Sequence, residues 1–297
     1  MKPASTAAIA TPAPTPDIAC GNTAGSSEFL SDLYTGLGSQ RNDFRNYNLN
    51  RLIAAMVIQD QPNQGRNLAV LDIGCGSGVL TQIMTRLGMK VTGLEPNPDL
   101  AEAARLRDNR MTIHTGDGSI ADQLNQTFDC ITIIDVLEHI EDDIEQLHKI
   151  RRALKPGGRL VVLVPAYQCL FGKRDVRNGH FRRYSAGRLR RRVERAGMIV
   201  DDTRYWNAIG VIPYFIAERI LRRELDGDIR TENAKGPLQK AAISFLHFWY
   251  RKIENTFNLG VGLSAIAIAH RPENDADNHQ RNPSLLKAKA VRLDEAS

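Results

Sequence analysis

Three glycines at alternate positions follow a short apolar run, and an acid stands just before them. Asp72 precedes Gly74, Gly76 and Gly78. Closely spaced glycines between a strand and a helix let a ligand press against bare backbone at a helix N-terminus. The spacing is neither the G-x-G-x-x-G of dinucleotide sites nor a Walker loop. Because an acid would repel a pyrophosphate, Asp72 favours a cationic ligand.

Two further acids stand where later strands are expected to end. Glu95 closes the run 90–95, where a carboxylate can accept both hydroxyls of a ribose. Asp117 follows the run 111–114, and a carboxylate there can take an adenine amino group. Each acid alone could be an ordinary surface or turn residue. Their shared position at strand ends predicts a nucleoside-like ligand.

Polar side chains also follow the fourth and fifth expected strands. His139 can accept a proton near neutral pH. The alternative is that it only positions other residues of the site. His180, Arg183 and Tyr184 gather within one short run, and they could bind an anionic acceptor. The alternative is that Arg183 pairs with Asp175, and Tyr184 packs on the next helix, only to order the loop. We favour acceptor binding.

The elements that must position these residues alternate along the chain. Short apolar runs alternate with helical periodicities, which predicts an α/β fold with a mostly parallel sheet and right-handed crossovers. The expected strands are 67–72, 90–95, 111–114, 128–135, 159–164, 198–202 and 262–270. Helices are expected from 80 to 87, 98 to 107, 144 to 154 and 185 to 196.

Composition is typical of a globular protein in a reducing compartment. Of 297 residues, 42% are hydrophobic and 25% charged, which excludes wholesale disorder, and the net charge is +5. The four cysteines form no C-x-x-C pair, which argues against a disulfide framework and a structural zinc. We therefore expect a cytoplasmic protein without a metal site. The longest apolar runs, about ten residues, are too short to span a membrane.

The ends of the chain differ in composition from its centre. Residues 1–27 are rich in Ala, Pro and Thr, and 271–297 are polar, so both are expected to be disordered tails around a domain at 28–270. Apolar and aromatic residues with basic flanks fill most of 206–260. We expect a helical lid there, over the acceptor pocket. A further hypothesis is peripheral contact of 206–257 with the inner membrane face.

Together these segments resemble the class I S-adenosylmethionine (SAM)-dependent methyltransferases. The resemblance is carried by the loop 72–78, Glu95, Asp117, the segment 135–139 and the turn 154–158, and it covers about 40–205 and 262–270. It implies a Rossmann-like seven-stranded sheet of order 3-2-1-4-5-7-6, with strand seven antiparallel and a helical insertion between strands six and seven. It also implies SAM as the cofactor. The implied cofactor-binding residues are Asp72, Gly74, Cys75, Gly76, Glu95, Pro96, Asp117, Gly118, Asp135 and Val136.

The segment Gly-His-x-Arg-Arg-Tyr at 179–184 looks like a bacterial subgroup that often accompanies glycosyltransferases and lipid- or polysaccharide-modifying functions. The sequence thus predicts methyl transfer to an oxygen or nitrogen of a small-molecule or lipid-like acceptor, sugar-linked or anionic forms included. His139, His180, Arg183 and Tyr184 are the predicted acceptor-side residues. The alternatives are RNA methylation through the basic helix Arg182–Arg195, which we rank lower, and a SAM-binding regulator without turnover.

Overall fold

The computed structural model describes residues 44–61, 65–216 and 236–274. All of them fall within one compact unit, Leu37–Ser297. The expected tail 1–27, most of the expected tail 271–297, and residues 217–235 of the expected lid lie outside the described residues.

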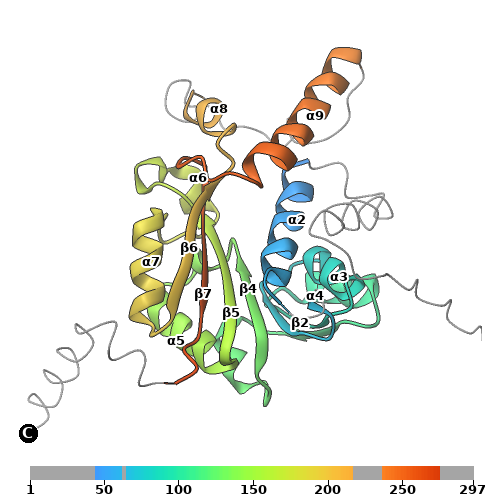
Figure 1. The fold of residues 1–297 in the computed structure, drawn as a ribbon, viewed down its shortest axis with the longest axis vertical. Coiled ribbons are helices and arrows are strands. Elements are labelled where there is room, and N and C mark those ends of the chain that lie inside the picture. The colour runs from blue at the N-terminus through green and yellow to red at the C-terminus, as the bar shows by residue number, and fades with distance from the viewer. Residues whose placement is uncertain (1–43, 62–64, 217–235, 275–297) are drawn as a thin grey trace, which may run out of the picture. The chain divides into compact units, whose positions relative to one another are not determined.

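A seven-stranded sheet of order β3-β2-β1-β4-β5-β7-β6 forms the centre of this unit (Figure 1). All neighbours pair in parallel except β7, which is antiparallel to both β5 and β6. The predicted order is therefore confirmed. The strands are β1 Ala69–Ile73, β2 Lys90–Glu95, β3 Thr112–Thr115, β4 Phe128–Ile134, β5 Leu154–Pro165, β6 Ile199–Trp206 and β7 Ser264–His270.

Strand pairing decides where β6 ends. The sequence predicted an end at residue 202. The structure continues β6 to Trp206, which pairs with Ser264 at the start of β7. Since β6 lies at the sheet edge, polar residues such as Asp202 remain exposed there.

Helices cover both faces of the sheet. Figure 1 shows α5 (Asp143–Ala153) and α7 (Ala186–Arg195) on one face, and α2 (Phe44–Ile58), α3 (Val79–Arg86) and α4 (Pro98–Arg107) on the other. Asn97 and Ser185 accept backbone N–H groups at the starts of α4 and α7, which caps both helices. The crossovers leave the carboxyl ends of the parallel strands facing one edge, where such sheets bind ligands.

The predicted helical insertion between β6 and β7 is present beyond that edge. It contains α8 (Val211–Phe215), α9 (Pro237–Trp249) and a π-helical turn η7 (Tyr250–Glu254). Shorter elements also border the edge: η2 (Gly118–Gln123), η3 (Leu137–His139), η4 (Gln168–Leu170) and α6 (Lys173–Arg177). No helix among the described residues is long and apolar enough to cross a membrane.

Candidate active site

The glycine loop leaves β1 and enters α3 through left-handed backbone. Gly74, Gly76 and Gly78 have φ of 73°, 54° and 77°, which L side chains rarely adopt. A Cβ on Gly74 would lie 2.2 Å from the Cγ2 atom of Val136, whereas a Cβ on Gly76 would meet nothing within 4 Å. Gly76 therefore presents bare backbone to open space, as the sequence predicts for a ligand-binding loop.

Glu95 holds this loop in place. Its carboxylate is buried at the end of β2, where Oε2 accepts from the backbone N–H of Gly76 at 2.8 Å and Oε1 from that of Asn97 at 3.0 Å. Each oxygen retains a second lone pair. Glu95 can thus support the loop and still accept a hydroxyl from a ligand.

Asp72 lies beneath the loop and is 3% exposed. Its two oxygens each accept a hydroxyl at 2.7 Å, one from Thr81 and one from Thr132. Burial raises the pKa of Asp72 to about 6; the two hydroxyl contacts oppose this rise, and the neighbouring Glu95 adds to it. The Asp72 carboxylate therefore joins α3 to β4 beneath the loop, and its effect on a cationic ligand stays a prediction.

The side chain of Cys75 also turns inward. It packs with Ala101, Ala104, Met111 and Ile113, and burial raises the pKa of its thiol to about 12. Only the backbone of Cys75 remains for a ligand.

The remaining cofactor-side residues follow β2 and β3. Pro96 and Asp117 are exposed, and Asp117 accepts the backbone N–H of Ser119 at 2.8 Å. Hydrogen bonds from the side chain and then from the backbone of Ser119 lower the pKa of the Asp117 carboxyl. Asp117 is thus a turn acid as well as a candidate ligand. Gly118 is buried against Gln146, whose amide donates to the Gly118 carbonyl at 2.7 Å.

A cavity of about 240 Å³ opens beside the loop, at the ends of β4, β5 and β6. Its lining includes Arg45, Asp135, Glu138, His139, Arg174, Asp175, His180, Arg183, Asn207, Tyr214 and Ser264. Non-glycine residues adopt positive φ just after each of these strands: Asp135 at 53°, Tyr167 at 62° and Asn207 at 69°. Such strain gathers at functional sites, because it persists only where the surroundings enforce it.

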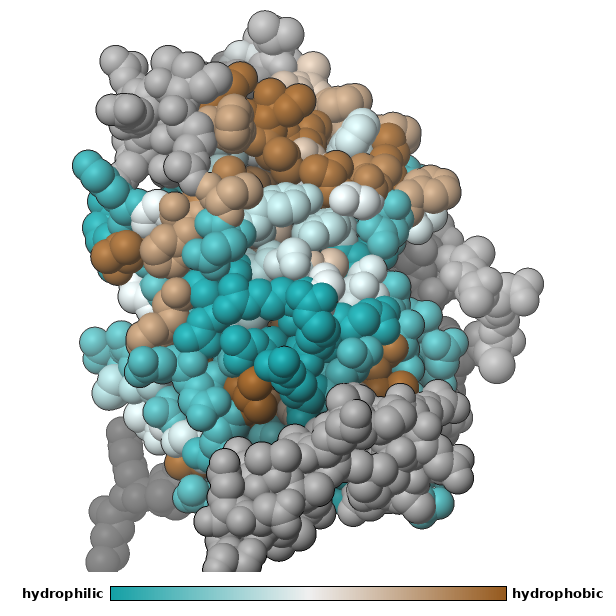
Figure 2. Space-filling view, turned by 90° about the vertical axis from the view of Figure 1, so that its left-hand side faces the viewer, coloured by the Kyte–Doolittle hydropathy of each residue, from teal (hydrophilic) through white to brown (hydrophobic). Residues whose placement is uncertain are grey.

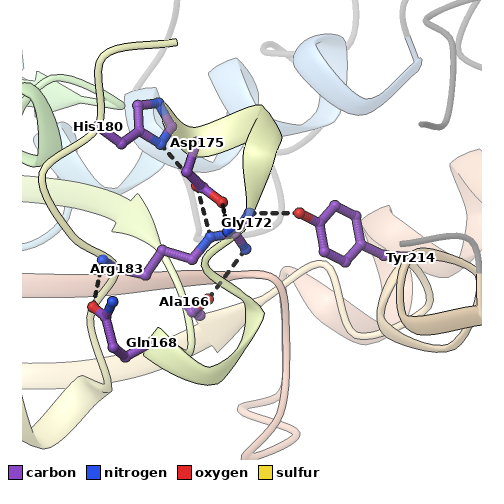
Figure 3. A network of polar contacts seen from close by, with 7 residues as sticks. All are labelled: Ala166, Gln168, Gly172, Asp175, His180, Arg183 and Tyr214. Carbon is purple, nitrogen blue, oxygen red and sulfur yellow. Dashed lines mark hydrogen bonds and ion pairs between the residues drawn. The ribbon is translucent and has the colours of Figure 1, made fainter. Parts of the chain in front are cut away.

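Asp175 is the centre of a buried polar network in the cavity wall (Figure 3). Its carboxylate accepts from Arg183 Nε at 2.8 Å and from the Gly172 N–H at 2.9 Å, and it contacts His180 Nδ1 at 2.9 Å. Burial alone would raise the pKa of Asp175, but the pairing with Arg183 lowers it below its usual value. The Arg183 guanidinium also donates to the hydroxyl of Tyr214 on α8, so the network ties the insertion to the cavity wall.

Glu138 and His139 form the cavity floor beside His180. Glu138 is 1% exposed, and its pKa is raised well above the usual value by burial and then by Asp135. The ring of His139 meets that of His180 edge to face, with centroids 4.5 Å apart. Burial, and then His180, lower the pKa of His139. Glu138 is not among the predicted site residues, although its place between Asp135 and His139 was a signal for it.

The predicted acceptor-side residues do not all lie in the same place in the structure. His139, His180 and Arg183 line the cavity, but Tyr184 has no exposed surface, and its hydroxyl donates to Asp143 at 2.7 Å in the core. The prediction that Tyr184 touches an acceptor is therefore wrong. The reason is local: Tyr184 forms a β-bridge with Ala166, and neighbours in extended backbone point to opposite sides. The alternative, in which Arg183 pairs with Asp175 and Tyr184 packs inside, describes these contacts.

Several arginines of the basic helix are engaged within the protein. Arg182 and Arg192 both pair with the buried Asp143, at 3.2 and 2.8 Å, and Arg190 pairs with Glu194. Arg191 and Arg195 are exposed. The cluster therefore offers RNA far fewer charges than its sequence suggests.

Comparison with known proteins decides the family. Residues 41–202, more than half of the chain, match the profile of a methyltransferase domain. The chain belongs to this methyltransferase family. Its cofactor is S-adenosylmethionine, and the loop fits this ligand, because Gly76 leaves open space beside its backbone and each oxygen of the Glu95 carboxylate retains a lone pair for a hydroxyl.

Two proteins with similar sequences are named as O-methyltransferases. The chain is 38% identical over 99 residues to the mitochondrial ubiquinone biosynthesis O-methyltransferase of Schizosaccharomyces pombe, and 35% identical over 96 residues to its counterpart in Xanthomonas oryzae pv. oryzae. Each match spans 31% of this methyltransferase, and 36% and 40% of the relatives.

A solved structure shows the fold beyond those stretches. The cyclase SpnF matches 84% of this chain and 93% of its own, with a TM-score of 0.52 and 20% identity. Because SpnF is named as a cyclase, the shared fold alone does not determine the reaction.

Proposed function

We propose that this methyltransferase moves the methyl group of SAM to an oxygen of a small amphiphilic acceptor bound in the cavity. The observation that carries the proposal is the continuity between loop and cavity. Val136 lies against Gly74 of the loop, and the preceding Asp135 lines the cavity. One short segment thus borders both ligands, which is what in-line transfer between them requires.

On the cofactor side, the loop backbone at Gly74, Cys75 and Gly76 borders the methionine part of SAM. Glu95, already held by the Gly76 N–H, accepts the ribose hydroxyls. The turn at 117–118 lies next to this acid, because the Gly116 N–H donates to the Glu95 carbonyl. Asp117 there faces the adenine, while Pro96 and Val136 flank the nucleoside and the methyl donor.

On the acceptor side, His139, His180 and Arg183 give the cavity a polar wall for the nucleophile and for anionic groups. An oxygen nucleophile is favoured over nitrogen because the two curated relatives are named as O-methyltransferases. Their names also refer to ubiquinone biosynthesis, which supports an amphiphilic acceptor.

The insertion supplies an apolar surface next to the polar cavity. Figure 2 shows a continuous hydrophobic region over α8 and α9. Its exposed side chains are Ile212, Phe215, Ile216, Phe245 and Phe248, between 41% and 71% accessible. The exposed Arg251 and Lys252 follow α9, and aromatic residues with basic flanks are typical of helices that lie on anionic lipid. We propose that the acceptor reaches the cavity from such a surface.

Labelled methyl transfer tests the function. Purified protein and methyl-labelled SAM are incubated with a bacterial extract that is then separated into lipid, small polar and RNA fractions. The expected result is label in the lipid fraction, and none with Glu95→Ala, which cannot hold SAM. Label in RNA would refute an amphiphilic acceptor. Bound SAM without label in any fraction would favour the regulatory alternative.

Flotation with anionic vesicles tests the apolar surface separately. Phe245→Ser combined with Phe248→Ser should abolish flotation and leave SAM affinity unchanged. Leu106→Ser is the matched control, because Leu106 is 78% exposed on α4, away from the insertion. Equal flotation of all three proteins would refute the lipid-surface assignment.

A further inference from the structure

Three metal-binding side chains converge at the floor of the cavity. Glu138 and His139 come from η3, after β4, and His180 comes from the loop between α6 and α7. One potential ligand atom from each lies within 4.8 Å of the other two. Glutamate and two histidines are the ligands of many catalytic zinc sites. No role in methyl transfer by itself requires the three to meet at one point.

The carboxylate of Glu138 lacks a partner that its burial demands. The residue is 1% exposed, and its Oε2 has no hydrogen-bond partner among the described residues. Buried polar atoms nearly always have a hydrogen-bond partner, because burial removes their hydrogen bonds to water and an unpaired atom pays that free-energy cost in full. The atom belongs to a residue that lines the cavity, where a cation would provide the missing contact.

Neighbouring groups orient both imidazole rings through hydrogen bonds, as is usual for histidines that bind metals. The Nδ1 atom of His180 lies 2.9 Å from the Asp175 carboxylate, which Arg183 and the Gly172 N–H hold in turn (Figure 3). His139 is hydrogen-bonded to the backbone of Gly179. If Nδ1 of His180 donates to Asp175, its Nε2 atom carries the free lone pair that a metal needs.

We propose that Glu138, His139 and His180 bind a divalent transition-metal cation such as Zn²⁺. Two nitrogen ligands favour such an ion over Mg²⁺ or Ca²⁺, which prefer oxygen ligands alone. Three protein ligands leave a coordination position open to the cavity. The site lies one helical turn after Asp135 and Val136, and so next to the proposed methyl donor.

The site would deepen the proposed function, on which this part of the inference rests. An acceptor hydroxyl that binds the cation loses its proton more easily, because the positive charge stabilises the alkoxide or phenolate. The proton leaves to solvent. The oxygen then forms a bond to the methyl carbon while the carbon–sulfur bond breaks, and S-adenosylhomocysteine departs with the electron pair.

Metal titration of the untagged full-length chain tests the site. The chain is stripped with EDTA and titrated with Co²⁺, whose visible spectrum reports its ligands, and then with Zn²⁺ in competition. One equivalent of each is expected. His180→Ala and Glu138→Gln should weaken binding by more than about 100-fold and change the Co²⁺ spectrum. His114→Ala is the matched control, since His114 is exposed on β3.

SAM affinity and thermal unfolding, measured on the same samples, separate the outcomes. SAM affinity should remain unchanged in His180→Ala, which shows that the chain is folded, although loss of the contact with Asp175 should lower the unfolding temperature. Equal Co²⁺ affinity in the wild type and both variants would refute the site. Methyl transfer that continues undiminished in EDTA would refute the metal's role but leave the proposed function standing. A bound equivalent of metal in a chain that methylates no acceptor would uphold the site and refute the function.

Discussion

Asp72→Asn should stabilise the protein at neutral pH, although it removes an acid from the cofactor loop. The carboxylate is buried beneath the loop, and burial raises its pKa from an ordinary 3.8 to about 6. Asparagine can keep both contacts, because its oxygen accepts from one threonine hydroxyl and its amide donates to the other. The substitution therefore removes a buried charge without leaving Thr81 or Thr132 unpaired.

The magnitude follows from linkage. Because the pKa is raised in the folded state, protonated Asp72 favours folding, and that contribution is lost as the pH rises from 3.8 through about 6. The free energy of unfolding of the wild type falls by about 1.4 kcal/mol for each pH unit in this window, about 3 kcal/mol in all. Asp72→Asn has no carboxylate here and no such loss. Its free energy of unfolding relative to the wild type should therefore rise by about 2 kcal/mol between pH 4.5 and pH 7.

Urea unfolding followed by circular dichroism at pH 4.5, 5.5 and 7 measures this difference. Asp117→Asn is the opposite control, because the pKa of exposed Asp117 is lowered in the folded state, and its removal should cost stability as the pH rises. A pH-independent difference between Asp72→Asn and wild type would refute the reasoning. SAM affinity should change little in Asp72→Asn, because the side chain lies beneath the loop and both threonine contacts are kept.

Three further substitutions test individual assignments. Gly76→Ala places a methyl group in the open ligand space at a φ of 54°, so SAM affinity measured by calorimetry should fall at least tenfold, and stability by about 1–2 kcal/mol. Tyr184→Phe removes the hydroxyl that donates to Asp143, so urea unfolding should show a loss of about 1–2 kcal/mol; a large fall in kcat at unchanged SAM affinity would contradict its placement in the core. Glu95→Ala should abolish detectable SAM binding in calorimetry, whereas Glu102→Ala, an exposed acid on α4, should bind SAM as the wild type does.

The sheet and the cofactor loop could be predicted because their signals are local. The alternation of apolar runs and helical periodicities, together with the resemblance, gave the strand order, and β2 and α4 match their predicted limits. The positive φ and open surroundings of Gly76 could be expected, since short segments encode backbone conformation. The end of β6 was missed because pairing with β7, a distant segment, decides it.

The acceptor side could be predicted only in part, because it depends on contacts between distant segments. The run 180–184 marked the right loop, yet which of its side chains faces the cavity depends on the bridge to Ala166. The contact of Arg183 with Tyr214 joins the loop to the insertion, and the sequence holds no signal for it. The free oxygen of Glu138 likewise becomes visible only when burial is known.

The segment from Asp135 to His139 connects the cofactor loop to the acceptor cavity. Asp135 adopts positive φ at the end of β4, which directs the chain past the glycine loop and into η3. Val136 then packs on Gly74, while the two residues at the end of the segment reach the cavity floor. In-line transfer tolerates little misalignment between donor and nucleophile. A single rigid turn that contacts both ligands fixes their separation more directly than two independent loops could, so substitutions at Val136 should impair transfer more than they impair the binding of either ligand.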